Sequence, residues 1–265
     1  MASKLIIDVK NLTKAYGDFT AVQGISFEVQ EGELFGFLGP NGAGKTTTIS
    51  MLTTLLSVTS GSVTVAGYDV VSERAEVRQN IGIIFQDPSL DIELTASENL
   101  RFHGMLYGMK SEELKQSIPD LLKRVELTEF ADKPVKTFSG GMKRRLEIAR
   151  GLVHTPKVLF LDEPTLGLDA QTRGRIWSYI NQLRKEHNIT IFLTTHYLEE
   201  TEHADRIAII DHGEIVAMDT PEQLKTTYDE HTIEQVFLKL TGRDIRDANV
   251  SALEQGREQF KRRMR

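Results

Sequence analysis

The chain has 265 residues, of which 40% are hydrophobic and 26% are charged, and its formal net charge is −6. This length fits one large or two small domains, the negative charge argues against nonspecific nucleic-acid binding, and the absence of cysteine excludes a disulfide scaffold and a thiolate metal site. No apolar run approaches the ~20 residues that span a bilayer, and the first ten residues, MASKLIIDVK, lack the apolar region of a signal peptide.

Hydrophobic patterning in the first third of the chain predicts short strands separated by glycine turns. The predicted strands are residues 4–9, 20–29, 34–38, 60–67 and 81–85. A turn at Tyr16-Gly17 separates the first two strands, and a helix is expected over 47–56. Residues 73–79 are expected to form a helical turn.

Residues 39–47, GPNGAGKTT, have the form G-x-x-x-x-G-K-[ST] between a predicted strand and a predicted helix, as a phosphate-binding loop requires. The alternative is a glycine-rich turn before an ordinary helix. In a phosphate-binding loop, main-chain N–H groups and the positive end of the helix dipole surround the phosphate oxygens. Lys45 then reaches the β- and γ-phosphates, and the Thr46 hydroxyl ligates Mg²⁺. The predicted nucleotide contacts are Gly39, Pro40, Asn41, Gly42, Ala43, Gly44, Lys45, Thr46 and Thr47.

The middle of the chain changes to a helical pattern. Residues 95–125 are expected to be helical, and Pro119 marks either a first-turn position or a kink. The predicted inward face consists of Leu100, Met105, Leu106, Leu114, Ile118, Leu121 and Leu122. A second helix opens at Ser139-Gly140-Gly141, so 88–150 is predicted to be a mostly helical insertion between two parts of a parallel sheet.

Apolar runs typical of strands buried on both faces return in the last third of the chain. The predicted strands are 157–161, 189–193 and 206–210, followed by a hairpin strand at 214–218. An amphipathic helix is predicted at 172–187, with Ile176, Ile180 and Leu183 inward. Alternating buried strands and helices predict an α/β fold with a parallel sheet.

Polar residues follow three of these strands: Gln86, then Asp162-Glu163, then His196. Because parallel strands end at one edge of the sheet, we expect these groups to gather around one γ-phosphate beside the phosphate-binding loop. Asp162 suits a Mg²⁺ contact, Glu163 can orient or deprotonate a water, and Gln86 can contact Mg²⁺ or that water. His196 can hydrogen-bond the γ-phosphate. Alternatively, the acidic pair only caps a strand end, and His196 alone carries little weight among the seven histidines.

The ordered motifs resemble those of the nucleotide-binding subunits of ATP-binding cassette (ABC) transporters, over roughly residues 4–240. The motifs are Tyr16, the loop 39–47, Gln86, FSGGM at 138–142, VLFLDEP at 158–164, LGLD at 166–169, and His196. The resemblance implies a phosphate-loop NTPase core with a mainly parallel sheet, an antiparallel β subdomain and a helical insertion subdomain at about 88–150. It implies an ABC ATPase domain at 1–240 and a short C-terminal extension at 241–265.

The resemblance also implies how two subunits assemble. Ser139, Gly140 and Gly141 open a helix that faces the γ-phosphate held by a second subunit, Tyr16 stacks on adenine, and Asp169 helps to join the two sites. The implied assembly is a head-to-tail homodimer that binds ATP and Mg²⁺ and works with a separate transmembrane permease. Gln86 and residues 87–110 would sense that permease, or 87–110 is a plain helical surface. The implied location is the cytoplasmic face of the cell membrane.

Departures from the commonest family pattern indicate a branch. Phe138 and Met142 replace Leu and Gln of LSGGQ, and Leu166 replaces the usual Ser of SGLD. With these departures and the segment TIEQVFLKLTG at 232–242, the chain is similar to ATPase subunits of drug-resistance and polysaccharide- or Nod-factor-type exporters. The alternatives are an importer subunit, a soluble ABC ATPase without a transport role, and a nonhydrolytic switch; Glu163 argues against the last.

The basic tail at 256–265 has two interpretations. It is a solvated, frayed terminus, or it contacts anionic lipid or the membrane subunit.

Overall fold

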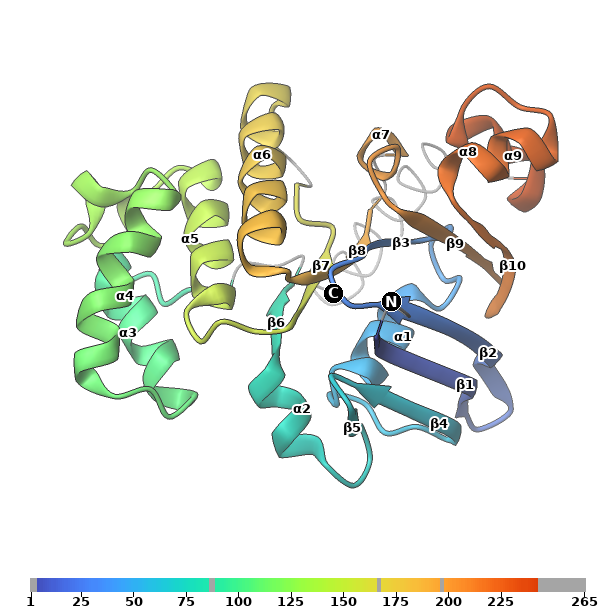
Figure 1. Cartoon of the computed structure of the whole chain (residues 1–265), viewed down its shortest axis with the longest axis horizontal. Helices are drawn as coiled ribbons and strands as arrows, with labels where there is room; N and C mark the ends of the chain where they lie inside the picture. The colour runs from blue at the N-terminus through green and yellow to red at the C-terminus, as the bar shows by residue number, and fades with distance from the viewer. Residues whose placement is uncertain (1–3, 86–88, 166–167, 196–197, 243–265) are drawn as a thin grey trace, which may run out of the picture.

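The computed structural model describes residues 4–85, 89–165, 168–195 and 198–242, which form two β-sheets and a separate group of helices (Figure 1). The smaller sheet is antiparallel. Its strands run in the order β2 (Phe19–Gln30), β1 (Leu5–Tyr16), β4 (Ser60–Val65) and β5 (Tyr68–Asp69). The strand predicted at 4–9 therefore continues to Tyr16, because pairing with β2 extends to the hairpin end.

The larger sheet confirms the predicted α/β architecture. Its order is β10 (Glu214–Asp219), β9 (Arg206–Asp211), β3 (Leu34–Leu38), β8 (Thr190–Thr194), β7 (Val158–Asp162) and β6 (Ile81–Ile84). All strands from β9 to β6 are parallel, and β10 closes the predicted hairpin. The carboxyl ends of β3, β6, β7 and β8 therefore lie at one edge of this sheet.

Phenylalanine side chains join the two sheets. Phe27 of β2 stacks on Phe35 of β3 with the ring centroids 5.5 Å apart, and Phe192 of β8 contacts both rings. Phe37 and Phe160 extend the same cluster, and all five side chains are buried. Such aromatic packing contributes a large share of the apolar area buried in a core. It fixes the antiparallel sheet against β3, which leads into the phosphate-binding loop.

The first helix is shorter than predicted. α1 spans Lys45–Leu52, whereas the sequence predicted 47–56. Thr53 is its C-cap and Thr54 adopts φ of +64°, which stops the helix. The helical turn expected at 73–79 is α2 (Arg74–Asn80).

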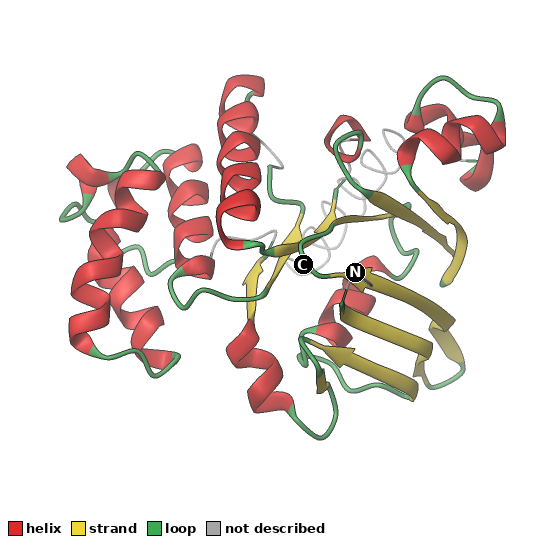
Figure 2. Ribbon diagram, viewed as in Figure 1, coloured by secondary structure: helices red, strands yellow, loops and turns green. Residues whose placement is uncertain are grey.

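The predicted helical insertion lies between β6 and β7 and forms its own group in space (Figure 2). It contains α3 (Ala96–Leu106), α4 (Ser111–Arg124), two short 3₁₀ turns (Thr128–Phe130 and Val135–Thr137) and α5 (Gly140–Leu152). Gly108, with φ of +77°, separates α3 from α4, so residues 95–125 form two helices that do not share one continuous apolar face. The prediction that Met105 and Leu106 face inward is therefore wrong, because they are 62% and 67% exposed. Pro119 lies inside α4, not in its first turn.

The C-terminal helices complete the described chain. α6 (Ala170–His187) begins slightly before the predicted helix and buries Ile176, Ile180 and Leu183 as expected. The other helices are α7 (Leu198–Thr201), α8 (Pro221–Tyr228) and α9 (Ile233–Thr241). In the described ranges, no helix is both long enough and apolar enough to cross a bilayer.

Candidate active site

Two glycines fix the backbone of the predicted phosphate-binding loop between β3 and α1. A Cβ on Gly39 would lie 2.3 Å from the carbonyl oxygen of Ile210 in β9, so the loop backbone passes too close to β9 for any other residue. Gly44 is the N-cap of α1 and adopts φ of +109°, which side chains rarely allow. Gly42 also has positive φ, of +80°. The loop geometry therefore explains the glycine spacing.

The N-terminus of α1 is available to an anion. Gly44 is the N-cap and makes no side-chain hydrogen bond to the first turn. The Thr46 side chain is exposed, whereas Thr48 turns inward and donates to the carbonyl oxygen of Gly44 at 2.9 Å. Unpaired N–H groups and the helix dipole at this point favour negative charge. The site therefore fits a phosphate group.

The Lys45 side chain lies over this loop and is only 7% exposed. Its Nζ donates to the carbonyl oxygens of Gly39 at 2.6 Å and Pro40 at 3.1 Å. Burial lowers the pKa of the Lys45 ammonium below its ordinary value, while the charges of Glu163 and then Asp162 act in the opposite direction. The structure thus brings the predicted lysine and the predicted acidic pair into one electrostatic environment.

Strand β8 orients the acidic pair at the end of β7. The Thr194 hydroxyl donates to Asp162 Oδ1 at 2.5 Å, and the main-chain N–H of Glu163 donates to the carbonyl oxygen of Thr194 at 3.0 Å. Glu163 adopts φ of +51°, a left-handed conformation that costs a non-glycine residue about 1–2 kcal/mol. Such strain is typical of functional positions, where the surroundings hold the residue in place.

A second group of predicted residues meets at the start of α6. Ser139 is the N-cap of α5, and its Oγ accepts from the Met142 N–H at 3.3 Å. A Cβ on Gly141 would lie 3.0 Å from Thr172, whereas Gly140 has open space beside it. Asp169, the N-cap of α6, accepts from the Thr172 N–H at 2.9 Å and from its hydroxyl at 2.7 Å. These hydrogen bonds hold the pKa of Asp169 below its ordinary value.

Tyr16 lies at the hairpin end of the antiparallel sheet. It is opposite Phe19 across the hairpin, and both rings are exposed. The Lys14 ammonium lies 5.1 Å from the Tyr16 ring centroid. An exposed aromatic pair of this kind offers a flat face to a stacked base.

Several predicted residues lie outside the described part of the chain. They are Gln86, Leu166, His196 and the basic tail 256–265. Their predicted roles remain predictions.

Sequence reasoning missed two buried charged residues that contact the site, Arg144 and Glu200. Glu200 on α7 accepts hydrogen bonds from the Thr165 hydroxyl, from the Thr195 hydroxyl at 2.5 Å and from Trp177 Nε1 at 2.8 Å. Thr165 follows the acidic pair and Thr195 precedes His196, so one carboxylate joins both segments. In the sequence, each of these charged residues lies near apolar helix positions. Hydrophobic periodicity alone does not distinguish a buried charged residue from an exposed one at such a position.

Comparisons with known proteins agree with this geometry. Residues 22–166 match the family model described as ABC transporter. The linearmycin resistance ATP-binding protein LnrL of Bacillus subtilis is 45% identical over 249 residues, which cover 94% of this chain and 78% of that protein. The doxorubicin resistance ATP-binding protein DrrA of Mycobacterium tuberculosis is 42% identical over 254 residues, covering 94% and 75%. The Nod factor export ATP-binding protein I of Ralstonia nicotianae is 41% identical over 227 residues, covering 85% and 70%.

Solved structures share the fold. An ATP-binding subunit of an ABC transporter superposes with a TM-score of 0.81 at 28% identity, covering 89% of this chain and 99% of that one. The ATP-binding cassette MJ0796, solved as a dimer in a post-hydrolysis state with ADP and Pi, gives a TM-score of 0.73 at 29% identity, covering 81% and 98%.

Proposed function

Because this chain is an ATPase of the ABC transporter family, we propose that it hydrolyses ATP to power export through a separate membrane permease. The observation that carries the proposal is the shared environment of Lys45, Asp162 and Glu163 beside the uncapped start of α1. Residues 1–240 would form the ATPase domain, with the helical subdomain at about 88–150 and a short extension at 241–265.

The phosphate-binding loop would hold the nucleotide. The main-chain N–H groups of the loop, which Pro40 lacks, surround the phosphates, and the Lys45 ammonium leaves the Gly39 and Pro40 carbonyls to bind the β- and γ-phosphates. Tyr16 stacks on the adenine. This assignment is supported by the exposure of Tyr16 and by the confined backbone of the loop.

Mg²⁺ would bind between the loop and β7. The exposed Thr46 hydroxyl and the Asp162 carboxylate are the oxygen ligands that would hold this cation, since it prefers oxygen donors. The hydrogen bond from Thr194 orients Asp162 for this role. We assign Gln86 as a further ligand on sequence grounds alone. When bound, the cation neutralises charge on the transferred phosphoryl group.

Glu163 would be the general base. Its carboxylate orients a water and takes a proton from it as the water oxygen attacks the γ-phosphorus and the bond to the bridging oxygen of ADP breaks, which yields ADP and phosphate. The position of Glu163 directly after Asp162, with its main chain bonded to β8, supports this role. His196 would bond the γ-phosphate and hold the water.

A second copy of the chain would complete each site. Ser139, Gly140 and Gly141 form the start of α5, where Gly140 has open space beside it and Gly141 lies close to Thr172, the residue that Asp169 binds. We propose that this surface covers the γ-phosphate bound by the other copy in a head-to-tail homodimer. The dimeric state of the related cassette MJ0796 supports the arrangement. ATP would favour the closed dimer and hydrolysis the open one.

The permease would dock in an apolar groove of about 720 Å³ between α1, α2 and α3. Leu55, Phe85, Leu106 and Tyr107 are among its lining residues, and Phe102 and Met105 expose further apolar surface on α3. Apolar patches of this kind are typical of protein interaction sites. This surface falls partly within 87–110, the predicted sensor of the permease, and the chain would then lie at the cytoplasmic face of the membrane.

The direction of transport is proposed from the relatives whose names include drug resistance and Nod factor export. An importer subunit or an ABC ATPase without a transport role are the alternatives. Copurification of a multispanning membrane protein with the tagged chain supports a transport role, and its absence favours the soluble alternative. Uptake or extrusion by cells carrying that membrane protein then separates import from export.

Two variants of the purified chain test the site. Glu163→Gln should abolish ATP turnover, retain ATP binding and accumulate a dimer in size-exclusion chromatography. Lys45→Ala should lose nucleotide affinity itself. Full ATPase activity in Glu163→Gln would refute the assignment of the base, and retained affinity in Lys45→Ala would contradict the phosphate contact.

A further inference from the structure

Helix α5 carries a buried ion pair that the proposed mechanism does not use. Arg144 is 7% exposed and Glu147, one turn later, is 1% exposed, with Nη1 of Arg144 3.0 Å from Oε2 of Glu147. Burying two charges is costly unless further hydrogen bonds satisfy their remaining polar atoms. The partners of those atoms therefore indicate what the pair holds in place.

Arg144 donates to main-chain carbonyls at the ends of two strands. Its Nη2 donates to the carbonyl oxygen of Glu163 at 3.0 Å, and its Nε donates to that of Pro164. Its Nη1 donates to the carbonyl oxygen of Phe85, just past β6, at 2.6 Å. The rigid guanidinium fork can reach all three acceptors at once, which a lysine ammonium at the end of a flexible chain cannot.

The next two turns of α5 hold Ser89, which precedes α3 in the chain. Glu147 Oε1 accepts from the Ser89 main-chain N–H at 2.8 Å, and Arg150 donates to both the carbonyl oxygen and the hydroxyl of Ser89. We call Arg144, Glu147 and Arg150 the α5 ladder. Because α5 begins at the Ser139 cap, the ladder joins that helix to the segment carrying Glu163.

Arg144 acts on the strained part of this segment. Glu163 has φ of +51°, and its N–H is already fixed by Thr194. The bond from Arg144 fixes its carbonyl, so the peptide groups on both sides of Glu163 are held. A residue in an unfavourable backbone conformation keeps it only when the surroundings determine it in this way.

We propose that Arg144, oriented by Glu147, is a positioning residue that aims the Glu163 carboxylate at the attacking water. The proposal rests on the assignment of Glu163 as general base. It gives the helix that opens at Ser139 a second role, because any shift of α5 is transmitted to the Glu163 main chain.

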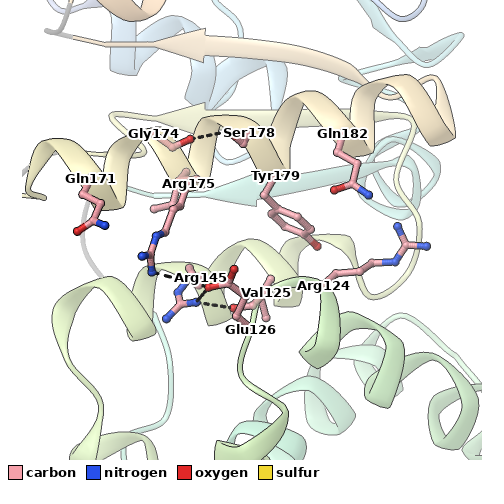
Figure 3. Close-up of a pocket in the computed structure, with 11 residues that line it drawn as sticks. Arg124, Val125, Glu126, Arg145, Gln171, Gly174, Arg175, Ser178, Tyr179 and Gln182 are labelled. Atoms are coloured by element: carbon pink, nitrogen blue, oxygen red, sulfur yellow. Dashed lines mark hydrogen bonds and ion pairs between the residues drawn. The ribbon is translucent and has the colours of Figure 1, made fainter.

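Arg145 provides a matched control on the same helix. Its side chain lines a groove of about 400 Å³ between α4, α5 and α6 (Figure 3). There it donates to Glu126 and to the carbonyl oxygen of Val125, both at 2.9 Å. Arg145→Lys therefore changes the same residue type on the same helix without touching the segment after β7.

The test compares Arg144→Lys with Arg145→Lys in the full-length chain, by steady-state ATP turnover and by equilibrium binding of a fluorescent ATP analogue. Arg144→Lys should lower kcat on the order of tenfold to a hundredfold, as expected for a misplaced catalytic group, with the nucleotide Kd changed less than about twofold. Arg145→Lys should keep kcat within about twofold of wild type. Equal kcat in the two variants would overturn the proposal, as would a loss of affinity that accounts for the whole effect.

A second measurement separates positioning from loss of structure. In the Glu163→Gln background, which should bind ATP without turnover, Arg144→Lys should leave nucleotide binding and ATP-dependent dimer formation unchanged, because a positioning residue for the base acts only on the chemical step. A failure to bind ATP or to dimerise in this background would instead indicate a general structural role and refute the proposal. A wild-type chain that binds ATP without hydrolysing it would refute the proposed function together with this inference.

Discussion

Replacing Glu200 by alanine should remove a large part of the stability of the fold. The carboxylate of Glu200 is buried and accepts from the Thr165 hydroxyl, the Thr195 hydroxyl and Trp177 Nε1. Each of the three buried donors left without an acceptor costs about 1–3 kcal/mol, so the variant should lose about 3–9 kcal/mol. Domains of this kind have only about 5–15 kcal/mol of stability in total.

The assay is thermal and urea unfolding of the purified chain. A loss of this size corresponds to a fall in Tm of at least about 6 °C. Glu199→Ala is the matched control, because Glu199 lies next to it on α7 and is exposed, and its effect should stay within about 0.5 kcal/mol. Glu200→Gln, which keeps one acceptor oxygen, should lie between the two. If Glu200→Ala melts within 2 °C or so of Glu199→Ala, the three hydrogen bonds do not contribute as argued.

Three further perturbations test other parts of the structure. Gly39→Ala forces a methyl group against the carbonyl oxygen of Ile210, so ATP affinity measured by calorimetry should fall at least about tenfold; unchanged affinity would contradict the close approach. Tyr16→Ala should weaken ATP binding by about tenfold without changing Tm, since the ring is exposed, and an unchanged Kd would remove the stacking role. Burial, together with the charge of Arg150, lowers the pKa of His103 from 6.5 to about 4. As the pH falls from 6.5 to 4, His103 therefore binds a proton in the unfolded chain but stays neutral in the native chain. Stability should therefore fall by about 2 kcal/mol across that window in wild type and by less in His103→Gln, and parallel pH profiles in urea unfolding would refute the assignment.

The sequence predicted the parts of the fold that depend on local patterns. Strands β3, β7 and β8 are continuous apolar runs, and their polar ends follow directly from the parallel arrangement. The glycine spacing of residues 39–44 likewise reflects local backbone requirements that the structure explains. Lys45, Asp162 and Glu163 were therefore found together from spacing and topology alone.

The rest depends on tertiary partners that a pattern does not encode. Met105 and Leu106 were expected to be buried, but the chain turns at Gly108 and they remain on the surface. The buried acceptor role of Glu200 requires α7 to lie against both Thr165 and Trp177, which are distant in sequence. The inward position of Arg144 similarly requires carbonyls from β6 and β7 to meet over α5.

The strand order of the larger sheet has a consequence for synthesis of the chain. Leu34 of β3 pairs with Ile191 of β8, and Phe35 pairs with Arg206 of β9, so the strand that leads into the phosphate-binding loop lies between partners made much later. Non-local pairings of this kind form slowly, because a long loop must close before they gain any contacts. A ribosome-bound chain whose strand β8 has not yet emerged already has the whole of residues 39–47, but it lacks both neighbours of β3. We therefore expect ATP to protect this loop from protease cleavage only after β9 has emerged from the ribosome.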